Sequence, residues 1–164
     1  MFMKRLLDNR SGDKGIPKTL FSFKKKKSFL VFTFYASDSS LSSYSDIDNG
    51  DLFNGDVVEL FLDLGDDFYY EFEVAPNGKI FVAKSYNGKP VFIENNFFFS
   101  EVKIRKQNYM VKMTIDLTKL KEINAIKFNA FRIETKGIKS EYILQALSPT
   151  LSNSFHIRDK FISL

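Results

Sequence analysis

Carboxylate side chains alternate with apolar ones along two neighbouring segments, residues 56–63 and 68–75. Successive side chains of a β-strand point to opposite faces, so this alternation places Glu59, Glu71 and Glu73 on one face and the apolar residues on the other. Two such carboxylates could in principle serve as the acid and the nucleophile of a glycosidase. The alternative, an exposed strand face whose charges basic residues neutralise, is the more common arrangement. We therefore expect no catalysis from these glutamates.

The turn between the two segments carries Asp63, Asp66 and Asp67 around a glycine. Calcium prefers oxygen ligands, so the three aspartates are candidate calcium ligands. The run lacks the full spacing of an EF-hand loop, and aspartates at a hairpin tip are also common as solvated turn formers. Calcium is therefore a candidate cofactor at this turn, with solvated aspartates as the alternative.

His156 is the only histidine, and the chain has no cysteine. These counts exclude a disulfide framework, a thiolate metal site, a cysteine nucleophile and a histidine metal cluster. A Ser-His-Asp arrangement would have to use His156, and the sequence contains no Gly-x-Ser-x-Gly nucleophile elbow. We expect a protein that is not an enzyme, with His156 as a surface or hydrogen-bonded residue of a loop.

The elements that must position these residues are strands, because nearly every periodic stretch of the chain has period two. The turn signals Asp-Asn-Gly, Gly-Asp-Asp, Pro-Asn-Gly and Asn-Gly-Lys-Pro separate the stretches. Only residues 116–123 read as a short helix, with Asp116 as its cap. The pattern predicts an all-β fold, an antiparallel β-sandwich of the immunoglobulin or jelly-roll kind with one short helix. The expected strands are residues 19–24, 28–36, 56–63, 68–75, 79–85, 99–105, 109–116, 126–135, 140–148 and 160–164.

A length of 164 residues fits one domain, and 44% hydrophobic residues indicate a folded protein. The net charge is +4, with four consecutive lysines at residues 24–27. We interpret them as a solvated hairpin turn, because single-strand nucleic-acid sites interleave basic and aromatic side chains along a groove. The opening MFMKRLLDN lacks the apolar run of a signal peptide, and no segment has the ~20 apolar residues of a membrane span. We expect a soluble chain that binds neither nucleic acid nor membrane, in a compartment that the sequence leaves open.

Four segments in a fixed order carry a family resemblance: DVVELFLD, YYEFEVAPNGKIF, FNAFRIE, and ALSPT followed by SFHIRDKF. Together they resemble the family nine carbohydrate-binding modules, especially the family-nine-like branch of stand-alone or appended domains. The resemblance spans residues 17–164 and leaves residues 1–16 as an N-terminal segment. It implies a non-catalytic β-sandwich that binds a sugar or a polysaccharide end and that can form part of a larger glycan-acting protein.

In that family a terminal sugar is clamped between two aromatic rings, and the two positions match Phe53 and Phe155. A pyranose packs its C–H faces on such rings, while its hydroxyls bond to carboxylate, guanidinium and amide groups. Glu59 matches a sugar-contacting acid, whereas Glu73 stands where the family has an arginine. The ligand-binding residues that follow from the resemblance and the acidic face are Phe53, Glu59, Glu71, Glu73, Asn129, Arg132, Phe155 and His156.

Two of these residues could have a structural role in place of a ligand contact. The alternation of FNAFRIE places Arg132 on the face opposite Phe131, where it either contacts a ligand or neutralises the glutamates in a salt-bridged network. Asn129 either contacts a ligand or satisfies backbone groups at a strand end.

Two other function classes remain. One is a structural or protein-interaction module that has the fold without sugar binding. The other is a haem-binding electron-transfer domain, with Met110 or Met113 paired with His156 or a lysine as axial ligands.

Overall fold

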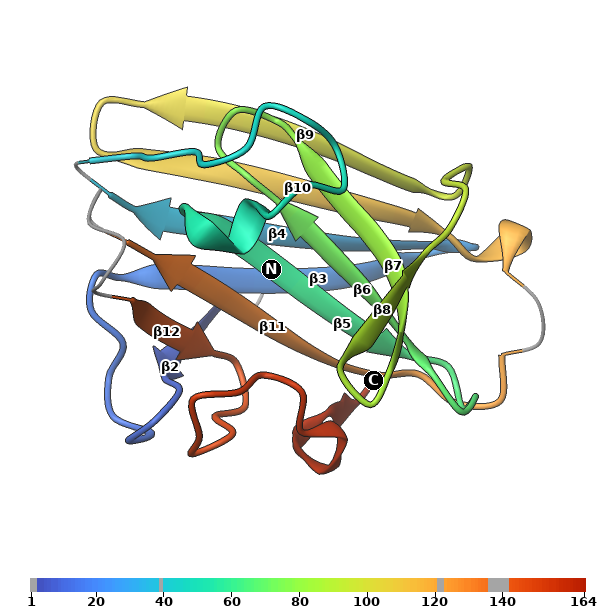
Figure 1. Cartoon of the computed structure of the whole chain (residues 1–164). Coiled ribbons are helices and arrows are strands. Elements are labelled where there is room, and N and C mark those ends of the chain that lie inside the picture. Colours follow the sequence, from blue (N-terminus) through green and yellow to red (C-terminus); the bar gives the residue numbers. More distant parts are fainter. Residues whose placement is uncertain (1–2, 39, 121–122, 136–141) are drawn as a thin grey trace.

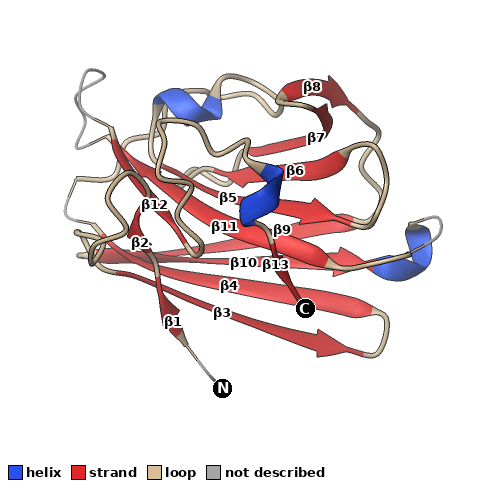
Figure 2. Cartoon of the chain, turned by 90° about the horizontal axis from the view of Figure 1, so that it is seen from below, coloured by secondary structure: helices blue, strands red, loops and turns tan. Residues whose placement is uncertain are grey.

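Two antiparallel sheets pack face to face in this computed structural model, which describes residues 3–38, 40–120, 123–135 and 142–164 (Figures 1 and 2). The five-stranded sheet has the order β1 (Lys4–Arg5), β3 (Thr19–Lys26), β4 (Phe29–Ser37), β10 (Asn108–Asp116) and β9 (Phe98–Arg105). The eight-stranded sheet has the order β2 (Leu7–Asp8), β12 (Ile143–Ala146), β11 (Lys127–Glu134), β5 (Val57–Asp63), β6 (Tyr69–Val74), β7 (Ile80–Tyr86) and β8 (Lys89–Phe92), with β13 (Ile162–Ser163) paired to β11. The antiparallel β-sandwich expected from the sequence is confirmed.

The helices among the described residues are short 3₁₀ turns: η1 (Leu52–Asn54), η2 (Leu117–Lys119) and η3 (Arg158–Lys160). The helix expected over residues 116–123 is only η2 within the described range, and Asp116 caps it by accepting a hydrogen bond from the backbone N–H of Thr118. None of the described helices is long and apolar enough to cross a membrane.

Three of the strands were not predicted from the sequence: β1, β2 and β8. β1 and β2 have two residues each, which is too short for a period to be visible. β1 pairs with β3 and β2 pairs with β12, so residues 4–8 contact both sheets. The expected domain boundary after residue 16 stays a prediction. The expected strand 140–148 begins at residues 140–141, which lie outside the described residues.

The main core fills the space between the sheets. Leu60 and Phe72 of the eight-stranded sheet lie in one buried cluster with Phe32 and Phe34 of the five-stranded sheet. Phe72 also stacks on Phe98 with ring centroids 4.6 Å apart. Each such side chain contributes about 1.5–3 kcal/mol on burial, which explains how a chain without disulfides holds two sheets together.

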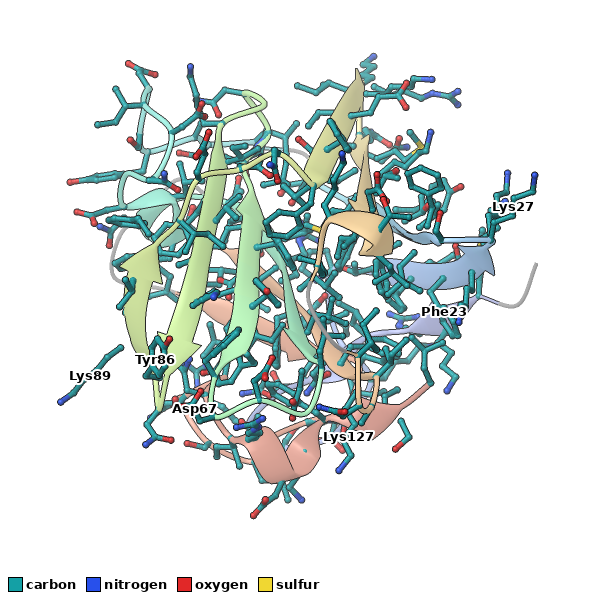
Figure 3. All side chains as sticks on the ribbon, turned by 90° about the vertical axis from the view of Figure 1, so that its right-hand side faces the viewer. Phe23, Lys27, Asp67, Tyr86, Lys89 and Lys127 are labelled. Carbon is teal, nitrogen blue, oxygen red and sulfur yellow. The ribbon has the colours of Figure 1, made fainter. Side chains whose placement is uncertain are left out.

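The first three of the four lysines at residues 24–27 form the exposed end of β3, and Lys27 begins the turn to β4. In Figure 3, Lys27 and Phe23 lie on one side of the molecule, and Asp67, Tyr86 and Lys89 lie on the other. The basic turn is therefore remote from the acidic hairpin tip.

A second buried cluster covers the outer face of the eight-stranded sheet, the face turned away from the sandwich interior. Phe61 and Phe131 pack on this face with centroids 4.9 Å apart. Leu52 of η1 and Phe155 and Phe161 of the C-terminal segment (red in Figure 1) cover them. This sheet is consequently apolar on both faces, which period-two patterning alone does not predict.

Candidate functional site

The three glutamates lie on the outer face of the eight-stranded sheet, as their alternation predicts. Glu59 of β5 pairs with Glu73 of β6 on one side and with Phe131 of β11 on the other. Glu71, two residues before Glu73 on the same strand, pairs with Phe61. Antiparallel register therefore gathers side chains from two strands into one acidic cluster, which we call the glutamate triad: Glu59, Glu71 and Glu73.

The carboxylates of the triad converge and are buried. One oxygen of each lies within 4.8 Å of the others, and the residues are 3%, 5% and 2% exposed for Glu59, Glu71 and Glu73. The Oε2 atoms of Glu71 and Glu73 have no hydrogen-bond partner. The expectation of an exposed, solvated acidic face is thus wrong, because η1 and the C-terminal segment lie over it.

Burial also controls the protonation of the triad. Desolvation raises the pKa of Glu59 and Glu73 well above the ordinary value, and the charges of neighbouring carboxylates raise it further. Desolvation raises the pKa of Glu71 to about 7, although the nearby Ser85 hydroxyl opposes the change. Without a ligand, the triad therefore holds protons near neutral pH.

The triad lines a pocket of about 470 Å³ on this face. Phe53 of η1 and Phe92 of β8 are about half exposed, and Phe92 packs edge-on against the buried Phe81 at 5.2 Å between centroids. The lining includes, among others, Asn49, Asp51, Phe53, Glu59, Glu71, Glu73, Phe81, Phe92, Phe155 and His156. Six of the eight ligand-binding residues expected from the sequence thus meet in one pocket.

The aromatic pair expected from the resemblance has unequal exposure. Phe53 is 45% exposed, but Phe155 is 7% exposed and stacks on Phe131 with centroids 4.2 Å apart. Phe155 therefore forms a fixed wall of the pocket. The accessible rings are Phe53 and Phe92, and sequence reasoning missed Phe92 because only the fold of the β7–β8 hairpin brings it to this face.

His156 lines the same pocket and is held on three sides. Its Nδ1 lies 2.5 Å from the hydroxyl of Tyr69, and its ring stacks on Phe61 at 5.0 Å between centroids. Gly88, at φ +79°, lies so close that a Cβ there would be 3.3 Å from the imidazole. Burial lowers the pKa of His156, so the ring is neutral at neutral pH and does not balance the charge of the triad.

The candidate calcium turn is occupied by an arginine. Arg158 of η3 donates two hydrogen bonds of 2.7 Å to the carboxylate of Asp63 and a third to the backbone oxygen of Asp66. Burial alone would raise the pKa of Asp63, but the bonds from Arg158 and Gly65 hold it below its ordinary value. Among the described residues, Asp63, Asp66 and Asp67 do not form a cluster of converging oxygens.

Two expected ligand residues lie outside the pocket. Arg132 points into the sandwich interior, where its guanidinium bonds to Asp38 at 2.8 Å and to Thr19 Oγ1 at 3.0 Å. It therefore cannot neutralise the triad on the other face. The side chain of Asn129 donates to the backbone oxygen of Ser148 and accepts from its N–H, which matches the strand-end alternative.

The structure brings neither haem-ligand methionine candidate near His156. Met113 is fully buried between the sheets, whereas His156 lies on the outer face of the eight-stranded sheet. Met110 lies on the outer surface of the other sheet, next to Lys112 and Tyr35. Neither Met110 nor Met113 is therefore placed to share an iron with His156.

No family model and no curated protein matches this sequence. Among solved structures, a candidate carbohydrate-binding protein from Bacteroides uniformis superposes with a TM-score of 0.80, at 16% identity, over 98% of this chain and 84% of that one. A family 9 carbohydrate-binding module from Caldicellulosiruptor kristjanssonii, in complex with cellotriose, gives a TM-score of 0.63 at 16% identity, over 88% of this chain and 71% of the module. The same kind of module with glucose gives 0.62 at 17% identity, over 86% and 72%. The chain has the fold of these modules, and the resemblance inferred from its sequence is confirmed at the level of fold.

Proposed function

We propose that the chain binds a carbohydrate, without cleaving it, in the pocket above the glutamate triad. One observation carries the proposal: three buried carboxylates converge at the base of a pocket whose rim has exposed aromatic rings. A volume of about 470 Å³ suits a monosaccharide or the end of a longer glycan. The family 9 modules with this fold are seen with cellotriose and glucose, which supports the same ligand class here.

Each part of the pocket has a role in this proposal. Phe53 and Phe92 offer ring faces on which the C–H groups of a pyranose pack. The carboxylates of the triad accept hydrogen bonds from hydroxyl groups, and the unpartnered Oε2 atoms of Glu71 and Glu73 gain partners when a sugar binds. Within a larger glycan-acting protein, such a module would hold that protein on its glycan.

The electrostatics favour binding over hydrolysis. A glycosidase of the retaining type needs one ionised carboxylate as nucleophile beside one protonated acid. Here desolvation raises the pKa of all three glutamates, and in the described part of the chain no lysine or arginine lines the pocket to keep one of them ionised. Incubation with the bound glycan should therefore release no product.

The test is calorimetric titration with a panel of monosaccharides and polysaccharides. Phe53→Ala should weaken binding, whereas the control Phe99→Ala should not, because Phe99 is an exposed phenylalanine on β9 of the other sheet, away from the pocket. Both variants should keep the far-ultraviolet circular dichroism of the parent protein. Absence of binding across the panel would overturn the proposal and leave a protein-interaction module as the alternative.

A further inference from the structure

The pocket above the glutamate triad has an unbalanced charge. Its lining contains Glu59, Glu71, Glu73 and Asp51, and no lysine or arginine. His156 is the one basic residue of the lining, and its Nδ1 is already engaged by Tyr69. The described part of the protein thus brings four acidic side chains to the site and no cation to meet them.

Buried carboxylates of this kind require either protons or a positive partner. An uncompensated buried charge costs several kcal/mol, so burial favours the protonated form of these carboxylates. The Oε2 atoms of Glu71 and Glu73 lack any hydrogen-bond donor, although their residues are more than nine-tenths buried. A ligand that supplies both charge and donors would satisfy these atoms at once.

We propose that the pocket selects a sugar with a free amine, whose ammonium group is held by Glu59, Glu71 and Glu73 while its ring packs on Phe53 and Phe92. This inference rests on the proposed function and names its ligand class. An ammonium group has three donors for three carboxylates. Tetrahedral donors with charge-assisted N···O distances of about 2.8 Å place their acceptors about 4.6 Å apart. One oxygen of each triad carboxylate lies within 4.8 Å of the others, close enough for a single ammonium group to contact all three.

The surroundings fit an organic cation better than a bare metal ion. Calcium takes about six to eight oxygen ligands, and three glutamates provide at most six. The side-chain oxygen of Asn49, on the pocket lining, already accepts a bond of 2.9 Å from the backbone N–H of Val82. Aromatic faces, by contrast, attract ammonium groups, and the pocket is far larger than an ion requires.

The experiment compares three probes by calorimetry at neutral pH: glucosamine, N-acetylglucosamine and glucose. Acetylation removes the positive charge and keeps the ring, so the pair isolates the amine. We expect glucosamine to bind at least about tenfold more tightly than the other two, which is about 1.4 kcal/mol. Glu73→Gln should remove most of this preference, while Glu101→Gln, an exposed position on β9, should leave it unchanged.

The outcomes separate this inference from the proposed function. Equal affinity for the three probes overturns the amine selection and leaves carbohydrate binding intact. No binding of any sugar overturns both. A parallel titration with calcium chloride tests for a metal site. If the parent protein binds calcium, Glu73→Gln abolishes that binding and glucosamine shows no preference over the other sugars, the pocket is a metal-ion site and the inference is overturned. Tighter binding of glucosamine that Glu73→Gln removes confirms it.

Discussion

Raising the pH of the ligand-free protein should destabilise it through the glutamate triad. Burial raises the pKa of Glu71 from its ordinary value of 4.5 to about 7, so the folded state holds this proton more tightly than the unfolded state. The resulting stabilisation is fully present below pH 4.5 and is lost as the pH rises through about 7. The shift corresponds to about 3 kcal/mol of unfolding free energy. Glu59 and Glu73, whose pKa is also raised, add to the loss with the same sign.

The assay is urea unfolding at about pH 5 and about pH 8, followed by circular dichroism, for the parent protein and Glu71→Gln. Glutamine has the same shape and no charge, so the unfolding free energy of the variant should fall by about 2.5 kcal/mol less than that of the parent over this range. His156 contributes with the opposite sign, because burial lowers its pKa and its contribution is lost as the pH falls. This contribution is present in both proteins and cancels in the difference.

One result would refute the reasoning. If the unfolding free energy of the parent changed with pH no more than that of Glu71→Gln, then Glu71 would be ionised in the folded state without cost. The triad would in that case be hydrated or neutralised, and the argument for a cationic ligand would lose its physical basis. Thermal unfolding of the same two proteins provides an independent check of the sign.

Three further perturbations test other parts of the structure. Arg132→Met should cost about 3–5 kcal/mol in urea unfolding because it leaves the carboxylate of Asp38 buried without its partner, and a loss below about 1 kcal/mol would contradict this. Phe53→Ala should weaken sugar binding by roughly tenfold while leaving the melting temperature unchanged, since the ring is half exposed. Asp63→Asn should speed hydrogen exchange in residues 150–160, because it weakens the bonds from Arg158 that fix the C-terminal segment, and unchanged exchange would show that other contacts hold it.

Much of the fold was predictable because its signals are local. Alternation within residues 56–63 and 68–75 identified two strands and placed Glu59, Glu71 and Glu73 on a common face, and the structure has both. The short strands β1 and β2 carried no such signal, since two residues cannot display a period.

The surroundings of the glutamates were not predictable, because they come from distant parts of the chain. The segment that buries their face follows residue 150, and the partner of Asp63 is Arg158, 95 residues away. Likewise, alternation placed Arg132 on the correct face but did not reveal Asp38, 94 residues away, as its partner. Period-two patterns report which side chains share a face, and they do not report what lies over that face.

The burial of three carboxylates is itself an argument for a ligand. The row that contains Glu59 and Glu73 is flanked by Phe131 and Phe81, so apolar side chains already pack on this face. Replacing buried charged groups with apolar ones of similar volume is often neutral or stabilising, and the fold therefore does not need the glutamates. Groups that oppose folding and have perturbed pKa values in a pocket are typical of functional sites. Among the described residues, the pocket lining contains no lysine or arginine, and this supports the proposal that the positive charge arrives with the ligand.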